Sequence, residues 1–203
     1  FDENSGDVAN DSVGSAHLNF TGTNGGQWRT CVLGNCAFFD GVDDEARVDV
    51  EDTVTDFSVS LWVQANHSGQ PRYSSAIAVN DVAGDDQSFQ IMAGGGSPGD
   101  WELYHNNSYS FGVVDPTVWQ HLVATFLNDT VTLYLDGVEV LNQSVPNGTV
   151  NSIELYKFGV NRAGSTHFTG VIDEVQIWDA ALTEEEVEDV HDEIVWICPN
   201  FNT

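Results

Sequence analysis

The feature that most constrains the fold is a succession of short apolar runs, each ended by Gly, Asp or Asn. In residues 56–65 (DFSVSLWVQA), apolar and polar residues alternate, so the side chains of Phe57, Val59, Leu61 and Val63 share one strand face. Similar runs occupy residues 46–50, 74–79, 88–93, 101–105, 119–127, 130–143, 152–160 and 170–178. Asp136-Gly137 is a strong hairpin signal within this series. Strands without intervening helices predict an all-β, antiparallel sandwich or jelly roll.

One short helix is expected near the C-terminus. Thr183 and Glu186 form the T-x-x-E pattern of a capping box, and the glutamates beside them favour a helix N-terminus. Val187, Val190 and Ile194 then recur at helical spacing.

The domain organisation is expected to be simple. The Gly-rich stretches are short, and no internal repeat is present, so residues 1–190 are expected to form one domain. Residues 191–203 contain the apolar sequence IVWICPNF. We expect them to be an extension that packs on this domain or on a neighbouring one.

Charge narrows the set of partners. The chain has 32 Asp and Glu against 5 Lys and Arg, a net charge of −27. This charge repels phosphate backbones and anionic membranes, so nucleic acid is excluded as a partner. No apolar run is long enough to cross a bilayer, so direct membrane insertion is not expected.

The acids are scattered and aromatic residues are plentiful, which argues against disorder. At 1 M salt the Debye length is about 3 Å, so repulsion between surface carboxylates is largely screened. The composition therefore predicts a folded domain adapted to molar salt, from a halophilic microbe, an archaeon.

Cysteines and sequons indicate an extracellular location, on a cell or virion surface. Cys31 and Cys36 enclose four residues without a second pair or a nearby His, which favours a local disulfide over a metal site. Cys198 is either free or paired elsewhere. The candidate glycosylation sequons begin at Asn10, Asn19, Asn66, Asn106, Asn128, Asn142 and Asn147.

Several segments occur in an order that identifies a family. They are FDENSG (1–6), FFDGVDD (38–44), FSVSLWV (57–63), WQHLVATF (119–126), LYLDG (133–137) and GVIDEVQIWDAAL (170–182). Together they resemble the laminin-G-like jelly-roll domains of the concanavalin-A-like lectin/glucanase superfamily, over almost the whole chain. The resemblance implies two curved antiparallel sheets packed face to face. It implies no particular ligand, because the fold hosts lectins, adhesion modules, spacers and enzymes.

The resemblance also implies a candidate calcium site, because related jelly rolls often carry this ion. The candidate ligands are acids of one turn and of the first and last strands: Glu3, Asp40, Asp43, Asp44 and Asp173. Glu3 and Asp173 would converge if the terminal strands pair, as the resemblance suggests. The loop with Asp81, Asp85 and Asp86 is a second candidate. With 32 acids in the chain, such clusters also arise by chance.

Catalysis is not expected from these residues. Glucanases place two carboxylates on one strand face, and no Glu-x-Asp-x-x-Glu motif is present. Asp173 and Glu174 fall on opposite faces of a predicted strand, and no Ser or Cys nucleophile motif stands out. His121 is a general base, a ligand or a hydrogen-bonded structural residue, and the family pattern favours the last.

The candidate ligand-binding residues are Trp62, Trp101 and Trp178. Trp62 and Trp178 either line a sugar-binding sheet or pack against the protein. We predict a non-catalytic, extracellular carbohydrate-binding or adhesion module of a halophile surface protein, recognising surface glycans. The alternative is a structural module of a filament, virion or cell-surface assembly, contacting neighbouring protein subunits and no small ligand. Phe1 falls within the first strand of the family pattern, so the chain is expected to belong to a longer polypeptide.

Overall fold

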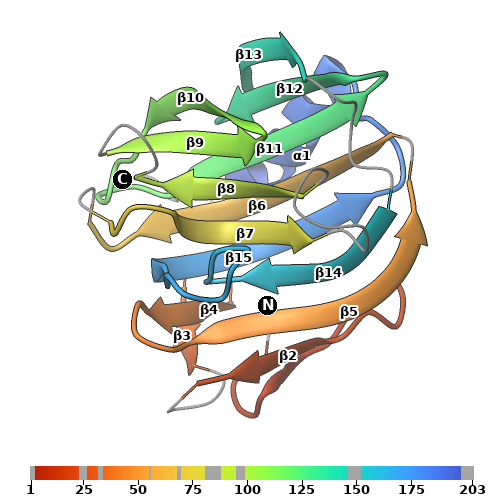
Figure 1. Ribbon diagram of the computed structural model, residues 1–203. Helices are drawn as coiled ribbons and strands as arrows, with labels where there is room; N and C mark the ends of the chain where they lie inside the picture. Colours follow the sequence, from red (N-terminus) through yellow and green to blue (C-terminus); the bar gives the residue numbers. More distant parts are fainter. Residues whose placement is uncertain are drawn as a thin grey trace.

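The computed structural model describes residues 3–22, 27–31, 34–54, 56–67, 70–80, 88–94, 99–145 and 152–197. These residues form fifteen strands and one helix (Figure 1). The strands are β1 (Val8–Ala9), β2 (Leu18–Thr21), β3 (Gln27–Thr30), β4 (Asn35–Asp40), β5 (Glu45–Thr53), β6 (Phe57–Ala65), β7 (Ser74–Asn80), β8 (Phe89–Ala93), β9 (Asp100–His105), β10 (Asn107–Val113), β11 (Gln120–Leu127), β12 (Thr130–Leu135), β13 (Val138–Ser144), β14 (Ser152–Phe158) and β15 (Thr169–Trp178). The helix is α1 (Glu184–Ile197).

The strands form two antiparallel sheets that pack face to face. The eight-stranded sheet has the order β1-β2-β5-β14-β7-β8-β9-β10, and the seven-stranded sheet has the order β13-β12-β11-β6-β15-β4-β3. Several neighbours in each sheet are distant in sequence, so the chain repeatedly crosses between the sheets (Figure 1). The expected all-β jelly-roll sandwich with one short C-terminal helix is confirmed.

The core lies between the sheets and is built by alternation along the strands. On β6, the side chains of Phe57, Val59, Leu61 and Val63 all face the core. The Phe57 ring stacks on the Phe126 ring of β11 at 4.5 Å between centroids. Because the sheet pleat sends every second side chain inward, the same pattern that predicted the strand also fixes its inner face.

Helix α1 packs on the outer face of the seven-stranded sheet, behind β11 and β12 in Figure 1. The predicted capping box begins the helix, since Thr183 N–H donates to Glu186 Oε2 at 2.8 Å and Glu186 N–H donates to Thr183 Oγ1 at 3.3 Å. Val187 packs on β11 and β12, and the buried Ile194 packs against Trp62. Such burial of one apolar face holds a helix on a sheet.

The helix continues past residue 190, so the start of the expected extension is part of α1 and lies on this domain. Side chains beyond Ile194 lie outside the described residues, and the packing of the rest of 191–203 remains a prediction. No helix in the described part of the chain is long and apolar enough to span a membrane.

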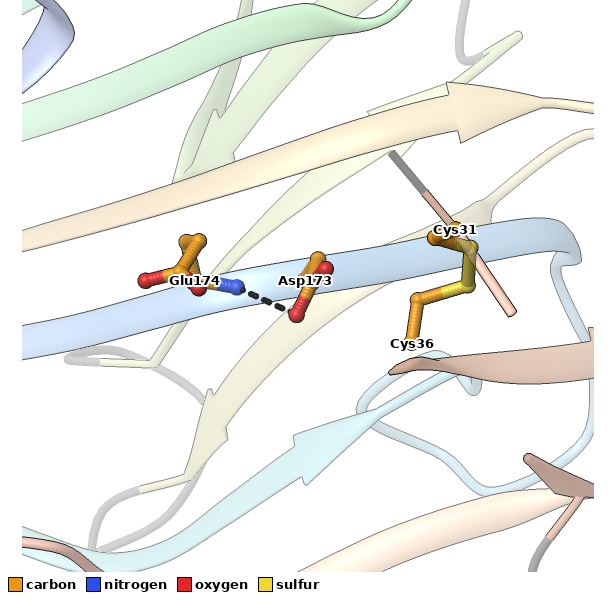
Figure 2. The surroundings of a disulfide bond; sticks show 4 residues. All are labelled: Cys31, Cys36, Asp173 and Glu174. Atoms are coloured by element: carbon orange, nitrogen blue, oxygen red, sulfur yellow. Dashed lines mark hydrogen bonds between the residues drawn. A yellow bond between two sulfur atoms is a disulfide. The ribbon is translucent and has the colours of Figure 1, made fainter. Parts of the chain in front are cut away.

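A disulfide joins Cys31 to Cys36 across the β3–β4 hairpin (Figure 2). The two Cα atoms are 5.8 Å apart, a normal spacing for such a bond. The predicted local disulfide is therefore confirmed. Cys198 lies outside the described residues.

Candidate functional site

Three acids gather in the turn between β4 and β5. Asp40 ends β4, Asp43 and Asp44 precede β5, and one carboxylate oxygen from each lies within 4.8 Å of the others. The turn depends on Gly41, whose φ of 82° favours glycine and whose Cα leaves no room for a Cβ beside Thr169. Two internal hydrogen bonds fix the turn: Val42 N–H donates to Asp40 Oδ1 at 2.7 Å, and Asp40 N–H donates to Asp44 Oδ2 at 3.1 Å.

Electrostatics in this turn favour a bound cation. Asp44 is only 1% exposed, and its pKa is raised by burial and by the neighbouring carboxylates of Asp40 and Asp43. A divalent cation would relieve this repulsion. Calcium takes six to eight oxygen ligands, often from carboxylates and carbonyls of a turn, so these three acids fit part of a calcium shell.

The other predicted calcium ligands do not join this cluster. Glu3 instead accepts hydrogen bonds from the backbone and side chain of Asn10, at 2.7 and 2.9 Å. Strand β1 pairs in the eight-stranded sheet, whereas Asp173 lies on β15 in the seven-stranded sheet. Strands β1 and β15 therefore do not pair with each other, and the convergence of Glu3 with Asp173 stays a prediction. The acids of 81–86 lie outside the described residues.

Asp173 occupies a distinct buried position near the disulfide (Figure 2). It is 3% exposed, and its Oδ1 accepts a hydrogen bond of 2.9 Å from Glu174 N–H. Burial raises the pKa of this carboxyl to about 7. The register of β15 shifts here, and Glu174 has a φ of 46°, so the simple alternation expected for these two acids is interrupted.

A second arrangement lies on the outer face of the eight-stranded sheet, the face turned away from the core. Residues in cross-strand register form a line there, which we call the polar row: Asn19 (β2), Arg47 (β5), Lys157 (β14), Ala78 (β7), Gln90 (β8), Tyr104 (β9) and Ser108 (β10). On most of these strands the flanking residues point into the core, as Phe158 does beside Lys157. Alternation therefore turns the row outward.

The loop between β14 and β15 crosses the middle of the polar row. Arg162 N–H donates to Gln90 Oε1 at 3.0 Å, and the Arg162 carbonyl accepts from Lys157 Nζ at 2.8 Å. The Arg162 guanidinium lies 4.7 Å from the centre of the Tyr104 ring. Ala78, between Lys157 and Gln90, is fully buried, as a small residue beneath a crossing backbone would be.

Chemically, the accessible part of the polar row offers one amide, two hydroxyls, an aromatic ring and cations, whereas Gln90 is only 4% exposed beneath the Arg162 backbone. These groups donate to and accept from sugar hydroxyls, and a few convergent polar groups are what orient a small ligand. Sequence reasoning missed this face because its members come from seven strands that are distant in the chain. The signal was present only as single polar residues between core positions.

Two of the three candidate tryptophans are buried. Trp101 is 0% exposed in the core, where its Nε1–H donates to Gln120 Oε1 at 2.9 Å. Trp62 is 1% exposed and stacks on His191 of α1 at 5.4 Å between ring centroids. Neither ring presents a face to solvent, which corrects their assignment to a ligand surface. Trp178, at the end of β15, is partly exposed, and its role stays a prediction.

His121 is a buried structural residue on the outer face of the seven-stranded sheet. Its Nε2 lies 2.7 Å from Ser60 Oγ, and its ring stacks on Trp62 at 5.0 Å. Burial lowers its pKa to about 3, with a smaller contribution from His191, so the ring stays neutral. This arrangement matches the hydrogen-bonded structural alternative.

The sequons differ in exposure. Asn10, Asn19, Asn66, Asn128 and Asn142 are exposed, whereas Asn106 is partly buried. Asn147 lies outside the described residues. Their occupancy stays a prediction.

Residues 39–188 match the sequence profile of Laminin_G_3, in the concanavalin A-like lectin/glucanases superfamily. This chain belongs to that family. The Laminin_G_3 match spans most of the sandwich, including β5 to β15 and the Asp40–Asp44 turn. It confirms the jelly-roll family predicted from sequence, while a haloarchaeal origin stays a prediction. No curated protein matches this Laminin_G_3 chain in sequence.

Solved structures share the Laminin_G_3 fold at low identity. Domain 4 of an extracellular GH43 arabinanase from Geobacillus stearothermophilus, solved with arabinotriose, has a TM-score of 0.72 at 22% identity over 90% of this chain and 92% of that one. A botulinum neurotoxin C/D mosaic receptor-binding domain has a TM-score of 0.66 at 12% sequence identity, over 93% of this chain and 50% of that one. Trypanosoma rangeli sialidase, solved with the inhibitor DANA, has a TM-score of 0.68 at 14% sequence identity, over 94% of this chain and 31% of that one.

These neighbours overturn the expectation that this Laminin_G_3 chain is not an enzyme. Two of the three structures are parts of an arabinanase and a sialidase, so the fold occurs within enzyme chains. The missing Glu-x-Asp-x-x-Glu motif is a signature of one glucanase group, and its absence excludes only that arrangement of carboxylates. The likeness itself lies at the level of the fold.

Proposed function

We propose that this chain is a carbohydrate-binding or adhesion module of an extracellular surface protein, with the polar row as its ligand face. One observation carries the proposal: the chain and the arabinanase domain solved with arabinotriose cover each other over about nine-tenths of their lengths. The polar row supports it, because Asn19, Tyr104 and Ser108 bring hydrogen-bonding groups to one face. Calcium held by the Asp40–Asp44 turn is part of the proposal.

The confirmed disulfide supports placement outside the cell, because disulfides persist mainly in oxidising compartments. The net charge of −27 supports a halophile surface as the setting, since molar salt screens the repulsion that such a charge creates.

The test is binding to a glycan panel in molar KCl, with calcium and then with chelator. We expect at least one glycan to bind and Tyr104→Ala to weaken it, because this change removes the ring that supports Arg162. Tyr73→Ala is the matched control, because Tyr73 also lies under an arginine (Arg72, at 4.6 Å) but is outside the polar row. Equal losses in both variants, or binding unchanged in both, would move the ligand off this face.

A structural packing module is the second candidate, and strand β13 favours it. This strand ends the seven-stranded sheet and exposes Val138 (63%) and Val140 (42%). Sheet edges with exposed apolar side chains can pair with another chain. Silence across the glycan panel together with assembly that depends on protein concentration would favour this function.

A further inference from the structure

Lys157 is the chain's sole lysine, one of only five cations set against 32 acids. It lies partly buried on the outer face of the eight-stranded sheet, between the core residues Tyr156 and Phe158. Its Nζ donates to a backbone carbonyl, that of Arg162, at 2.8 Å. Among the described residues, no carboxylate forms an ion pair with it. An ammonium has three N–H donors, so this bond leaves donor capacity on the polar row.

The residue directly opposite Lys157 is a second cation. In the register of β14 and β5, Lys157 pairs with Arg47. Like charges directly opposite each other destabilise a sheet, and few cations are present to produce such a pair by chance. Burial lowers the Lys157 pKa, the Glu45 carboxylate opposes this shift, and the proximity of Arg47 adds a smaller lowering.

Neither of the nearby acids on the same face forms a hydrogen bond with Lys157. Asp49 Oδ1 accepts from Arg47 Nη2 at 2.7 Å, on a side chain that is largely exposed. Glu45 Oε1 accepts from Thr21 Oγ1 on β2 at 3.4 Å. Arg47 keeps further N–H donors beyond the one that Asp49 uses. The Lys157–Arg47 pair thus keeps unused N–H donors beside two acids, Glu45 and Asp49, on a strongly acidic protein.

We infer that Lys157 and Arg47 receive an anionic group of the carbohydrate ligand, so that the ligand is an acidic glycan. The inference rests on the proposed function and names its ligand class. The anionic oxygens of the glycan would accept hydrogen bonds from the remaining N–H donors of Lys157 and would lie between the two like charges. Uronic acid carboxylates and sugar sulfates share this chemistry. Charge-assisted hydrogen bonds are the strong ones, so they would determine which glycan binds.

The experiment compares three probes in molar KCl with chelator: an oligogalacturonate, its methyl ester, and a sulfated neutral oligosaccharide. Chelation removes any calcium bridge between the protein and a carboxylate. We expect an anionic probe to bind about tenfold or more tightly than the uncharged ester. Lys157→Gln should abolish the preference for the anion while binding of the ester persists, and Lys157→Arg should retain it. Arg72→Gln, away from the polar row, is the control and should change neither affinity.

The outcomes separate this inference from the proposed function. Preference for the carboxylate or for the sulfate identifies which anion the pair receives. Equal binding of anion and ester, or a preference that persists in Lys157→Gln, overturns the inference and leaves carbohydrate binding standing. Binding confined to neutral glycans likewise overturns the inference and leaves carbohydrate binding standing. Absence of binding to these probes and to the whole panel overturns both. Circular dichroism of each variant at the same salt verifies that the fold is retained.

Discussion

The backbone N–H of Asp40 donates a hydrogen bond to the buried carboxylate of Asp44, four residues along the same turn. This bond opposes the burial and the carboxylate repulsion that raise the Asp44 pKa. The bond thus holds the Asp44 carboxylate at a position where burial and the neighbouring carboxylates of Asp40 and Asp43 disfavour its negative charge. Calcium would complete the compensation, and a proton competes with it for the same oxygens.

We therefore expect calcium to raise the melting temperature of the protein, and Asp44→Asn to abolish that rise. A ligand present at 100 times its Kd stabilises a fold by about 2.7 kcal/mol. In chelator, Asp44→Asn should be at least as stable as the parent, because it removes a buried charge near two others. Thermal melts in molar KCl with calcium or chelator measure both effects. Glu139→Gln, on the exposed strand β13, is the control. An unchanged calcium response in Asp44→Asn would remove this turn as the site.

Asp173 predicts a loss of stability as the pH rises. Its folded pKa of about 7 lies above the unfolded value near 3.9, so between these values the folded state holds a proton that the unfolded chain has released. Stability from this group is complete below about pH 4 and is lost as the pH rises through 7. Asp173→Asn keeps the oxygen that accepts from Glu174 and cannot ionise.

We expect Asp173→Asn to be more stable than the parent at pH 8 by up to about 4 kcal/mol, and the difference to shrink towards pH 4. Urea unfolding at a series of pH values in constant molar KCl measures it. Asp192→Asn, at an exposed position of α1, is the comparison. A difference that does not vary with pH would contradict the assignment.

The buried His121 should give the opposite pH dependence of folding stability. Its folded pKa of about 3 lies below the unfolded value near 6.5, so in acid the unfolded chain binds a proton that the folded state refuses. Stability falls as the pH drops below about 6.5, by up to about 1.4 kcal/mol per pH unit. His121→Phe should remove this slope. At pH 7 it should cost about 1–3 kcal/mol, because Ser60 Oγ loses its partner.

The double variant Ser60→Ala/His121→Phe tests that cause. Removing both partners leaves no buried hydroxyl unsatisfied, so it should recover much of the loss seen at pH 7. Denaturant unfolding at pH 7 and pH 5 gives the free energies of unfolding of the parent, Ser60→Ala, His121→Phe and the double variant. An acid slope that persists in His121→Phe would point to another group.

The sequence predicted the inner faces of the strands well and the outer faces poorly. Alternation placed Val59 and Leu61 in the core, because one strand is enough to define that pattern. The same reasoning left open whether Trp62 lines a ligand surface or packs against the protein, since nothing within β6 indicates that Ile194 of α1, 132 positions later, covers it. Burial of an outer face depends on tertiary packing.

The two candidate sites differ in the same way. The Asp40–Asp44 cluster is local, so a single turn displays it in the sequence. The pairing of Lys157 with Arg47 depends on strands 110 positions apart meeting in one register. Sequence patterns within a strand contain no information on which strand lies beside it.

Salt dependence is the property expected to distinguish this protein from ordinary acidic domains. At 0.1 M ionic strength the Debye length is about 10 Å, so the 32 acids repel one another across the surface. At molar salt it falls to about 3 Å, and self-repulsion of the compact state is screened.

We expect the melting temperature to rise steeply with KCl from about 0.1 to 3 M, most of all in the lower part of the range. Repeating the series near pH 4, where many exposed carboxyls are protonated, separates screening from general salting-out effects, because only screening weakens with the charge. A flat dependence at neutral pH, or an equal slope at both pH values, would contradict adaptation to molar salt.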